Sequence, residues 1–381
     1  GTDPYKCRGA TRYVDAVAAP AEHPLVETAR RLAEELLEPA AAQVDASTVP
    51  RSHLQAMADA GLLGMVAPAE VGGGGASAPV FREVTEVLAG ADAATWFVQA
   101  QHQGVVRMLA GNAGPAAVRY LPRLATGELI AGFAFSHLRR FPERPVTARR
   151  VAAGWRLDGV APWYTGWGLN DVAFISGVTD DGDVVFGAVP AVEGGGLRMK
   201  TRLRTAALDA ACTVVLALDG VTVPDDDVAL QQPHAQWSAA DAGAADANPA
   251  IFGVAASALR LLGDAGAARE ELATTQAAVV LGQRIADVRT RCYALADAVP
   301  LGEAIDERLA LRAVALELLI AATSALVAAN SGPAMALTSP AQRKAREALF
   351  LLVQAQTASA RAATLNRWSA SAAATAPQTR A

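Results

Sequence analysis

The hydrophobic period of this 381-residue chain changes twice, and that change restricts the possible folds more than any other feature. In the first third, apolar residues recur every three or four positions, as in helices that bury one face. Glycine and proline breaks separate these segments. The predicted helical segments are 24–64 (two helices, interrupted at Pro39), 81–88, 96–110 and 116–124.

Short β-branched and aromatic runs replace the helical period after Gly127. Turn signals separate them, such as the Asp-Asp-Gly at 180–182 and the glycine run at 194–196. Several short strands at close spacing favour a small barrel or sandwich over a parallel sheet. The predicted strands are 130–138, 151–157, 172–178, 184–189 and 212–223.

Long alanine-rich helical patterns return at about residue 250 and predict a four-helix bundle, with Ser339 and Pro340 as an N-cap and a first helical residue. The predicted helices are 251–262, 270–298, 301–329 and 341–368. The fold class is therefore α+β: a helical domain at 24–127, a small β-barrel or sandwich at 128–235 and a helical bundle at 236–370. We set residues 1–23 apart as an artificial leader and expect 371–381 to fray.

Composition excludes several classes of partner. The net charge is −5 and there is no long basic run, so neither nucleic acid nor an anionic membrane is expected. We find no apolar stretch of transmembrane length and no signal peptide, and we expect a cytoplasmic protein. The cysteines Cys7, Cys212 and Cys292 are widely spaced and the five histidines show no ligand spacing, so we expect no disulfide framework and no metal site.

The segment 157–168, LDGVAPWYTGWG, has the composition of a ligand wall. The pair Asp158–Gly159 between apolar runs predicts a two-residue hairpin turn. After it, Trp163 and Tyr164 supply large aromatic faces beside the hydroxyl of Thr165, and the flanking glycines would let a flat ligand approach the backbone. The alternative is an edge strand with surface aromatics, since aromatics are common in strands.

The order of helices, small β domain and long helical bundle resembles the acyl-CoA dehydrogenase family. Two strands carry the resemblance. Residues 132–138, GFAFSHL, look like the family strand A-M-T-E, and residues 158–167, DGVAPWYTGW, align without a gap with N-G-x-K-x-W-I-T-N-G.

The resemblance implies FAD as cofactor. Trp163 would flank the isoalloxazine and Thr165 would place a hydroxyl at flavin N5, while Ser136 would reach the pyrimidine edge. The family's R-x-x-F-G, which holds the adenine half across a subunit contact, falls near AREELATTQ at 268–276. The cofactor residues implied in this way are Phe135, Ser136, Trp163, Tyr164, Thr165 and Arg269.

The first strand is followed by a departure from the family. Where the family has G-S-D, which touches the cofactor and the acyl-CoA phosphates, this chain has Arg139-Arg140-Phe141-Pro142-Glu143-Arg144. Arginine forks suit phosphate, so Arg139, Arg140 or Arg144 would supply the anion contacts. The alternative is a solvated basic loop.

The sharpest departure is at the catalytic base. Residues 340–357, PAQRKAREALFLLVQAQT, match the family's P-V-E-x-x-x-R-D-A-x-I-x-x-I-Y-E-G-T and place Ala355 on the catalytic Glu. The flanking Gln354 and Gln356 would contact substrate but cannot accept a proton. A second family position for the base falls on Asn248. Asp241 and Asp246 are the candidate substitutes for the missing base.

Three functions remain open. The chain is an acyl-CoA dehydrogenase-like oxidoreductase that acts as the base-lacking subunit of a mixed assembly, a flavin-dependent monooxygenase or oxidase on the same scaffold, or a silent acyl-CoA- or flavin-binding protein. The apolar helical surfaces predict a homo-oligomer or a related partner subunit. The resemblance also implies an electron-accepting flavoprotein as partner.

Overall fold

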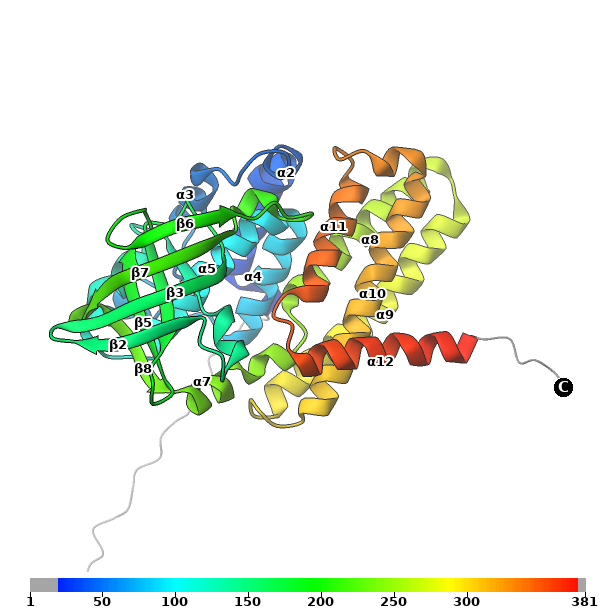
Figure 1. The fold of residues 1–381 in the computed structure, drawn as a ribbon. Helices are drawn as coiled ribbons and strands as arrows, with labels where there is room; N and C mark the ends of the chain where they lie inside the picture. The colour runs from blue at the N-terminus through cyan, green and yellow to red at the C-terminus, as the bar shows by residue number, and fades with distance from the viewer. Residues whose placement is uncertain (1–19, 376–381) are drawn as a thin grey trace, which may run out of the picture.

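The computed structural model describes residues 20–375; the first nineteen residues of the expected leader and residues 376–381 of the expected tail lie outside this range. The described chain begins with helices that pack against one side of a β-sheet (Figure 1). The helix expected to break at Pro39 instead continues through a π-helical turn, Ala33–Leu37. The N-terminal helices are α1 Pro24–Leu32, α2 Glu38–Asp45, α3 Arg51–Asp59, α4 Ala78–Ala91, α5 Ala93–Ala110 and α6 Pro115–Ala125.

The middle of the chain forms one eight-stranded sheet with the order β6-β7-β3-β2-β4-β5-β8, and β1 pairs with β4. The sheet doubles over itself, because a Cβ on Gly187 of β5 would lie 2.5 Å from the Val223 side chain of β7. Apolar residues of both halves fill the space between them, as in a sandwich. The strands are β1 Ala131–Ala134, β2 Val146–Val151, β3 Gly154–Tyr164, β4 Val172–Val178, β5 Asp183–Pro190, β6 Leu197–Arg202, β7 Val214–Pro224 and β8 Val228–Pro233.

The hairpin turn expected at Asp158–Gly159 is wrong, because both residues lie inside β3. The β2–β3 hairpin turns at Ala152–Ala153, between the paired residues Val151 and Gly154. At Asp158–Gly159 the pairing of β3 with β7 shifts register instead, and an Asp158 carboxylate oxygen accepts from the Gly220 N–H at 2.7 Å. The Asp-Gly pair therefore marks a bulge rather than a turn.

The C-terminal part is helical and packs as a bundle from which α12 projects along one side (Figure 1). The single helix expected at 341–368 is wrong, because the chain breaks between α11 and α12, where Ala355 has φ 51°. The helices are α7 His234–Ala240, α8 Pro249–Arg269, α9 Leu272–Ala298, α10 Ile305–Asn330, α11 Pro340–Val353 and α12 Ala358–Thr375.

Two helical stretches have the length and hydropathy of a membrane span, contrary to the expectation from sequence: His234–Ala268 and Ile305–Asn330. In each of them 56% of the apolar window is buried inside the protein. Burial of this kind is typical of the core helices of a bundle.

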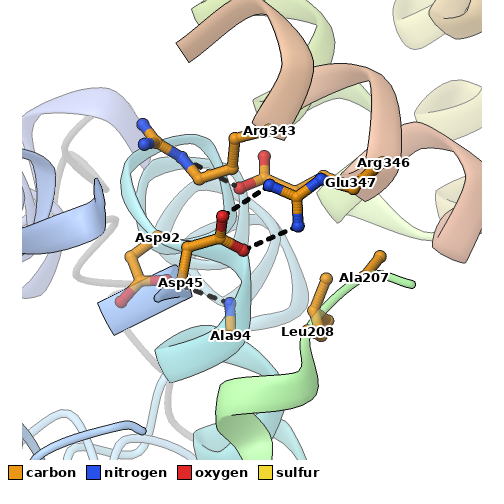
Figure 2. A pocket seen from close by; sticks show the side chains of 8 residues that line it. All are labelled: Asp45, Asp92, Ala94, Ala207, Leu208, Arg343, Arg346 and Glu347. Carbon is orange, nitrogen blue, oxygen red and sulfur yellow. Dashed lines mark hydrogen bonds and ion pairs between the residues drawn. The ribbon is translucent and has the colours of Figure 1, made fainter. Parts of the chain in front are cut away.

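A buried ionic cluster ties α11 to the N-terminal helices (Figure 2). Lys344 Nζ donates to the Gly90 carbonyl at 2.7 Å and to Glu347 Oε2 at 2.8 Å, and Arg346 makes a two-pronged ion pair with Asp45. A cavity lined by Asp45, Asp92, Arg343, Arg346 and Glu347, among others, has a volume of about 10 Å³, room for about one water molecule. Arg346 and Glu347 occupy the positions of the family's R-D pair, so this part of the resemblance has a structural role.

Candidate functional site

Trp163 is the exposed aromatic residue at the end of β3. The pairing of β3 with β7 shifts register between Ala161 and Tyr164, and within that bulge Trp163 has φ 59°. Its side chain is 59% exposed. A bulge can redirect a side chain away from the sheet, and a left-handed non-glycine residue is strained, which is a frequent property of ligand sites. The strand end therefore presents one flat, solvent-facing ring.

Tyr164 does not share that exposure. It is fully buried, its ring contacts Trp167 edge-on, and its hydroxyl accepts from Asn170 Nδ2 at 3.0 Å. Burial raises the pKa of this phenol, which therefore stays neutral. Tyr164 pairs with Val214 of β7 after the bulge, and its ring lies in the core while that of Trp163 lies at the surface. The prediction of Tyr164 as a cofactor contact therefore has no exposed ring behind it.

Thr165 and Ser136 are the two residues whose hydroxyls were expected to reach the flavin beside Trp163. Thr165 is 2% exposed, and its hydroxyl is 3.0 Å from the Thr213 hydroxyl. The Ser136 hydroxyl donates to the carbonyl of Pro162, the residue before Trp163, at 3.4 Å. The structure thus brings the two strand motifs together, although the Thr165 hydroxyl is engaged inside the protein.

Phe135 and Arg139 belong to the turn that follows β1. The 3-10 helix Ser136–Arg140 starts at this point, and the Arg139 guanidinium lies 5.5 Å from the centre of the Phe135 ring. Arg139 makes two bonds to the Asp241 carboxylate, at 2.7 and 2.8 Å. Through this pair Arg139 connects the β-sheet to the helical bundle. Its assignment as an anion contact stays a prediction.

Arg140 and Arg144 form surface ion pairs. Arg140 pairs with Glu143 at 2.5 Å, and both side chains are more than half exposed. Arg144 bonds to Asp180 and to the Thr179 carbonyl. Exposed pairs of this kind are worth about 0–1 kcal/mol, so either arginine remains available to a stronger anion.

The two positions that the resemblance assigns to a base, Asn248 and Ala355, lie close together. Asn248 is the N-cap of α8, and its Nδ2 donates to Gln354 Oε1 at 3.0 Å, next to Ala355. Gln356 Nε2 bonds to the Leu352 carbonyl at 3.1 Å. Both base positions therefore meet at one point of the fold, and neither carries a carboxylate.

Arg312 lies beneath this loop and was missed by the sequence analysis. It is 4% exposed and donates to the carbonyls of Gln354, Ala355 and Ala244. Burial, reinforced by Arg139, lowers its pKa to about 10, so the guanidinium stays charged at neutral pH. A charged residue within the apolar pattern of α10 was the available signal.

The two substitute bases are already engaged. Asp241 pairs with Arg139, and Asp246 Oδ1 accepts from the buried Arg308 at 2.6 Å. The role of either carboxylate as a substitute base stays a prediction.

Arg269 is held elsewhere. It lies in the last turn of α8, where its guanidinium donates to the Ala329 carbonyl and, at 3.4 Å, to Asn330 Oδ1. These contacts join it to the end of α10 rather than to the strand end with Trp163. Its proposed role toward adenine would therefore concern a neighbouring chain.

The residues at the strand end fit the ring of a flavin. The exposed Trp163 offers stacking area, and the part-buried Ser136 hydroxyl lies next to it with only a long bond to Pro162. The two arginines expected to contact the phosphates or the adenine half of FAD are both bonded within the described chain. Arg139 pairs with Asp241, and Arg269 bonds to the end of α10.

Comparison with known proteins shows what this chain is similar to. Residues 19–128 match the acyl-CoA dehydrogenase N-terminal domain. The very long-chain specific acyl-CoA dehydrogenase of Macaca fascicularis is 26% identical over 223 residues, which cover 54% of this chain and 33% of that protein. The 3-sulfinopropanoyl-CoA desulfinase of Paraburkholderia xenovorans (strain LB400) is 31% identical over 173 residues, 41% of each protein. The matched segments thus span about a third to two fifths of these relatives.

Solved structures cover almost the whole chain. Butyryl-CoA dehydrogenase from Megasphaera elsdenii has a TM-score of 0.77 at 16% identity, covering 90% of this chain and 97% of that one. A glutaryl-CoA dehydrogenase from Mycobacterium smegmatis in complex with FADH2 has a TM-score of 0.76 at 20% identity (91% and 94% covered). Dibenzothiophene monooxygenase from Paenibacillus sp. A11-2 has a TM-score of 0.74 at 18% identity (91% and 97% covered). Residues 19–128 therefore match the acyl-CoA dehydrogenase N-terminal domain, and the chain as a whole has the fold of these solved structures.

Proposed function

We propose that the chain is an FAD-binding acyl-CoA dehydrogenase-like protein that acts on an acyl thioester as the base-lacking subunit of a mixed assembly. The observation that carries the proposal is the combination of an exposed Trp163 ring with a base position, Ala355 beside Asn248, that holds no carboxylate. FAD, when bound, would accept the hydride of the dehydrogenation. Trp163 would stack on it and Ser136 would orient its edge. Because the side chain of Ala355 cannot accept the α-proton of the substrate, another group would have to accept it.

A flavin-dependent monooxygenase or oxidase is the second candidate. The absence of a carboxylate at Ala355 favours it, because this chemistry needs no base for an α-proton, and dibenzothiophene monooxygenase has the same fold. Anaerobic addition of an acyl-CoA to the flavin-loaded protein separates the two. Slow bleaching of the flavin absorption supports dehydrogenation; full retention of the oxidised spectrum with acyl-CoA bound supports the monooxygenase.

Replacing Trp163 with Ala is expected to empty the flavin site without unfolding the protein. The ring is 59% exposed, so its removal changes the free energy of unfolding by only about 0.5 kcal/mol. Loss of the stacking area should weaken FAD binding by at least tenfold, measured by quenching of FAD fluorescence. Trp368 on α12 is 36% exposed and gives a matched control, Trp368→Ala. Equal FAD affinity in the two variants would leave Trp163 as a surface residue of the strand.

The chain is expected to form a closed oligomer, a dimer or a tetramer. Exposed apolar side chains gather on α11 and α12, with Leu349 at 55%, Val353 at 61% and Leu365 at 55% exposure. Exposed apolar surface of this kind marks an interface, and a closed symmetric assembly buries the same surface on each subunit. Light scattering checks the prediction. A monodisperse 39.2 kDa monomer that retains FAD would contradict it.

A further inference from the structure

A second site lies between the end of α2, the strand β6 with the loop that follows it, and α11. Its cavity volume is about 410 Å³, within the roughly 300–1,000 Å³ of small-molecule pockets. Three arginines, Arg202, Arg204 and Arg346, and two carboxylates, Asp45 and Asp209, line it. The lining therefore has an excess of positive charge in a chain whose net charge is −5.

A bulge in β6 turns Arg202 toward the cavity. Arg198 pairs with Ala217 of β7, and Arg202 would share its face if the strand were regular. The register shifts between Met199 and Thr201, so that Arg202 instead pairs with Val214, which is buried. One extra residue in a strand moves the following side chains to the other face. The local backbone thus places a cation in this cavity.

The carboxylates do not satisfy the arginines. Asp209 alone serves two of them, at 3.5 Å from Arg202 and 3.3 Å from Arg204, and its other oxygen accepts from the Thr205 N–H at 3.0 Å. Arg346 is committed to Asp45. Arg204 is 80% exposed, so its guanidinium can turn toward a ligand at little cost in packing.

We propose that this cavity binds the diphosphate of a nucleotide-type ligand. Arginine forks match phosphate oxygens in geometry and charge, and Arg202 and Arg204 would exchange two loose contacts with one carboxylate for short bonds to a dianion. The Leu203 N–H donates to the Thr213 carbonyl at 3.0 Å, and the Thr213 hydroxyl contacts Thr165, so the cavity adjoins the strand end that carries Trp163. FAD and coenzyme A both carry a diphosphate, and either is a source.

Inorganic pyrophosphate is the first probe, titrated by calorimetry into the full chain at low salt. The Arg202→Ala/Arg204→Ala variant should bind it at least tenfold more weakly, the change that corresponds to about 1.4 kcal/mol. Arg284→Ala on α9 is the control of equal charge change, and Arg284 is likewise exposed. Equal affinity in the double variant and the control, or no binding by the wild type, overturns the proposal. Because Arg204 is largely exposed, Arg204→Gln alone tests the site if the double variant unfolds.

Titration with FAD and with coenzyme A then distinguishes the sources. Weaker binding of FAD alone in the double variant assigns the cavity to the cofactor, and weaker binding of coenzyme A alone assigns it to the substrate; the site stands in either case. This test is independent of the proposed function. A wild-type chain that binds pyrophosphate but neither FAD nor any acyl-CoA would refute the dehydrogenase proposal and leave the diphosphate site in place.

Discussion

Replacing Ala355 with Glu is expected to speed the reduction of bound flavin by an acyl-CoA by about 10²–10⁴-fold, the usual contribution of a positioned general base. Arg312 holds this loop through bonds to the carbonyls of Gln354 and Ala355. A carboxylate introduced beside Arg312 would be ionised at neutral pH. Anaerobic stopped-flow absorbance of the FAD-loaded variant measures the rate.

Ala355→Gln is the matched control for this prediction. Residue 355 has φ 51°, so Glu and Gln carry the same backbone strain, and only Glu can accept a proton. If both variants reduce flavin at the wild-type rate while still binding acyl-CoA, the alignment of Ala355 with the family's base is wrong. Acceleration by both variants would mean that side-chain size, and not basicity, changes the rate.

Replacing Lys344 with Met is expected to destabilise the fold by about 3–5 kcal/mol, as for a buried ion pair that loses one partner. Glu347 is 4% exposed and would remain without its 2.8 Å contact to Lys344. Chemical denaturation measures the loss. Glu143 gives a control from the exposed pair with Arg140: Glu143→Gln should change the free energy of unfolding by less than about 1 kcal/mol.

The Lys344→Met loss should grow with pH. Burial raises the pKa of Glu347, Asp92 raises it further, and Lys344 and Arg343 oppose the shift. Above its unfolded pKa, the folded state holds more protons than the unfolded state, so stability falls as pH rises. Removing Lys344 raises the pKa of Glu347 further, so the fall in stability continues to higher pH. The variant should therefore be less stable at pH 8 than at pH 5. A pH-independent difference would indicate that Lys344 acts only through its bond to Gly90.

Hydrophobic periodicity predicts elements that bury an apolar face. It does not predict strands that are formed mainly by backbone pairing with a neighbouring strand. The buried β4, Val172–Val178, was predicted with its observed bounds. Strands β2, β6 and β8 were missed, because VTARRV, LRMKTR and VALQQP each have few buried apolar residues. The Asp-Gly pair was read as a turn because its bulge depends on β7, which lies 60 residues away in the chain.

The candidate site depends even more on distant contacts. Trp163 could be named from the sequence because its motif is local, but its exposure and the burial of Tyr164 depend on how β3 pairs with β7. No local pattern shows that Asn248 contacts Gln354 or that Arg139 pairs with Asp241, since each contact joins segments about 100 residues apart. The assignment of Ala355 came from the family resemblance, and it stays a prediction.

The turn between α11 and α12 is held by the buried Arg312, whose guanidinium donates to the main-chain carbonyls of Gln354 and Ala355. An alanine codon that ends in A or G becomes a glutamate codon through one nucleotide change. A carboxylate can therefore appear or vanish at this point in a single mutational step. After a gene duplication, two copies of such a chain can diverge in activity and still retain the surfaces through which they associate.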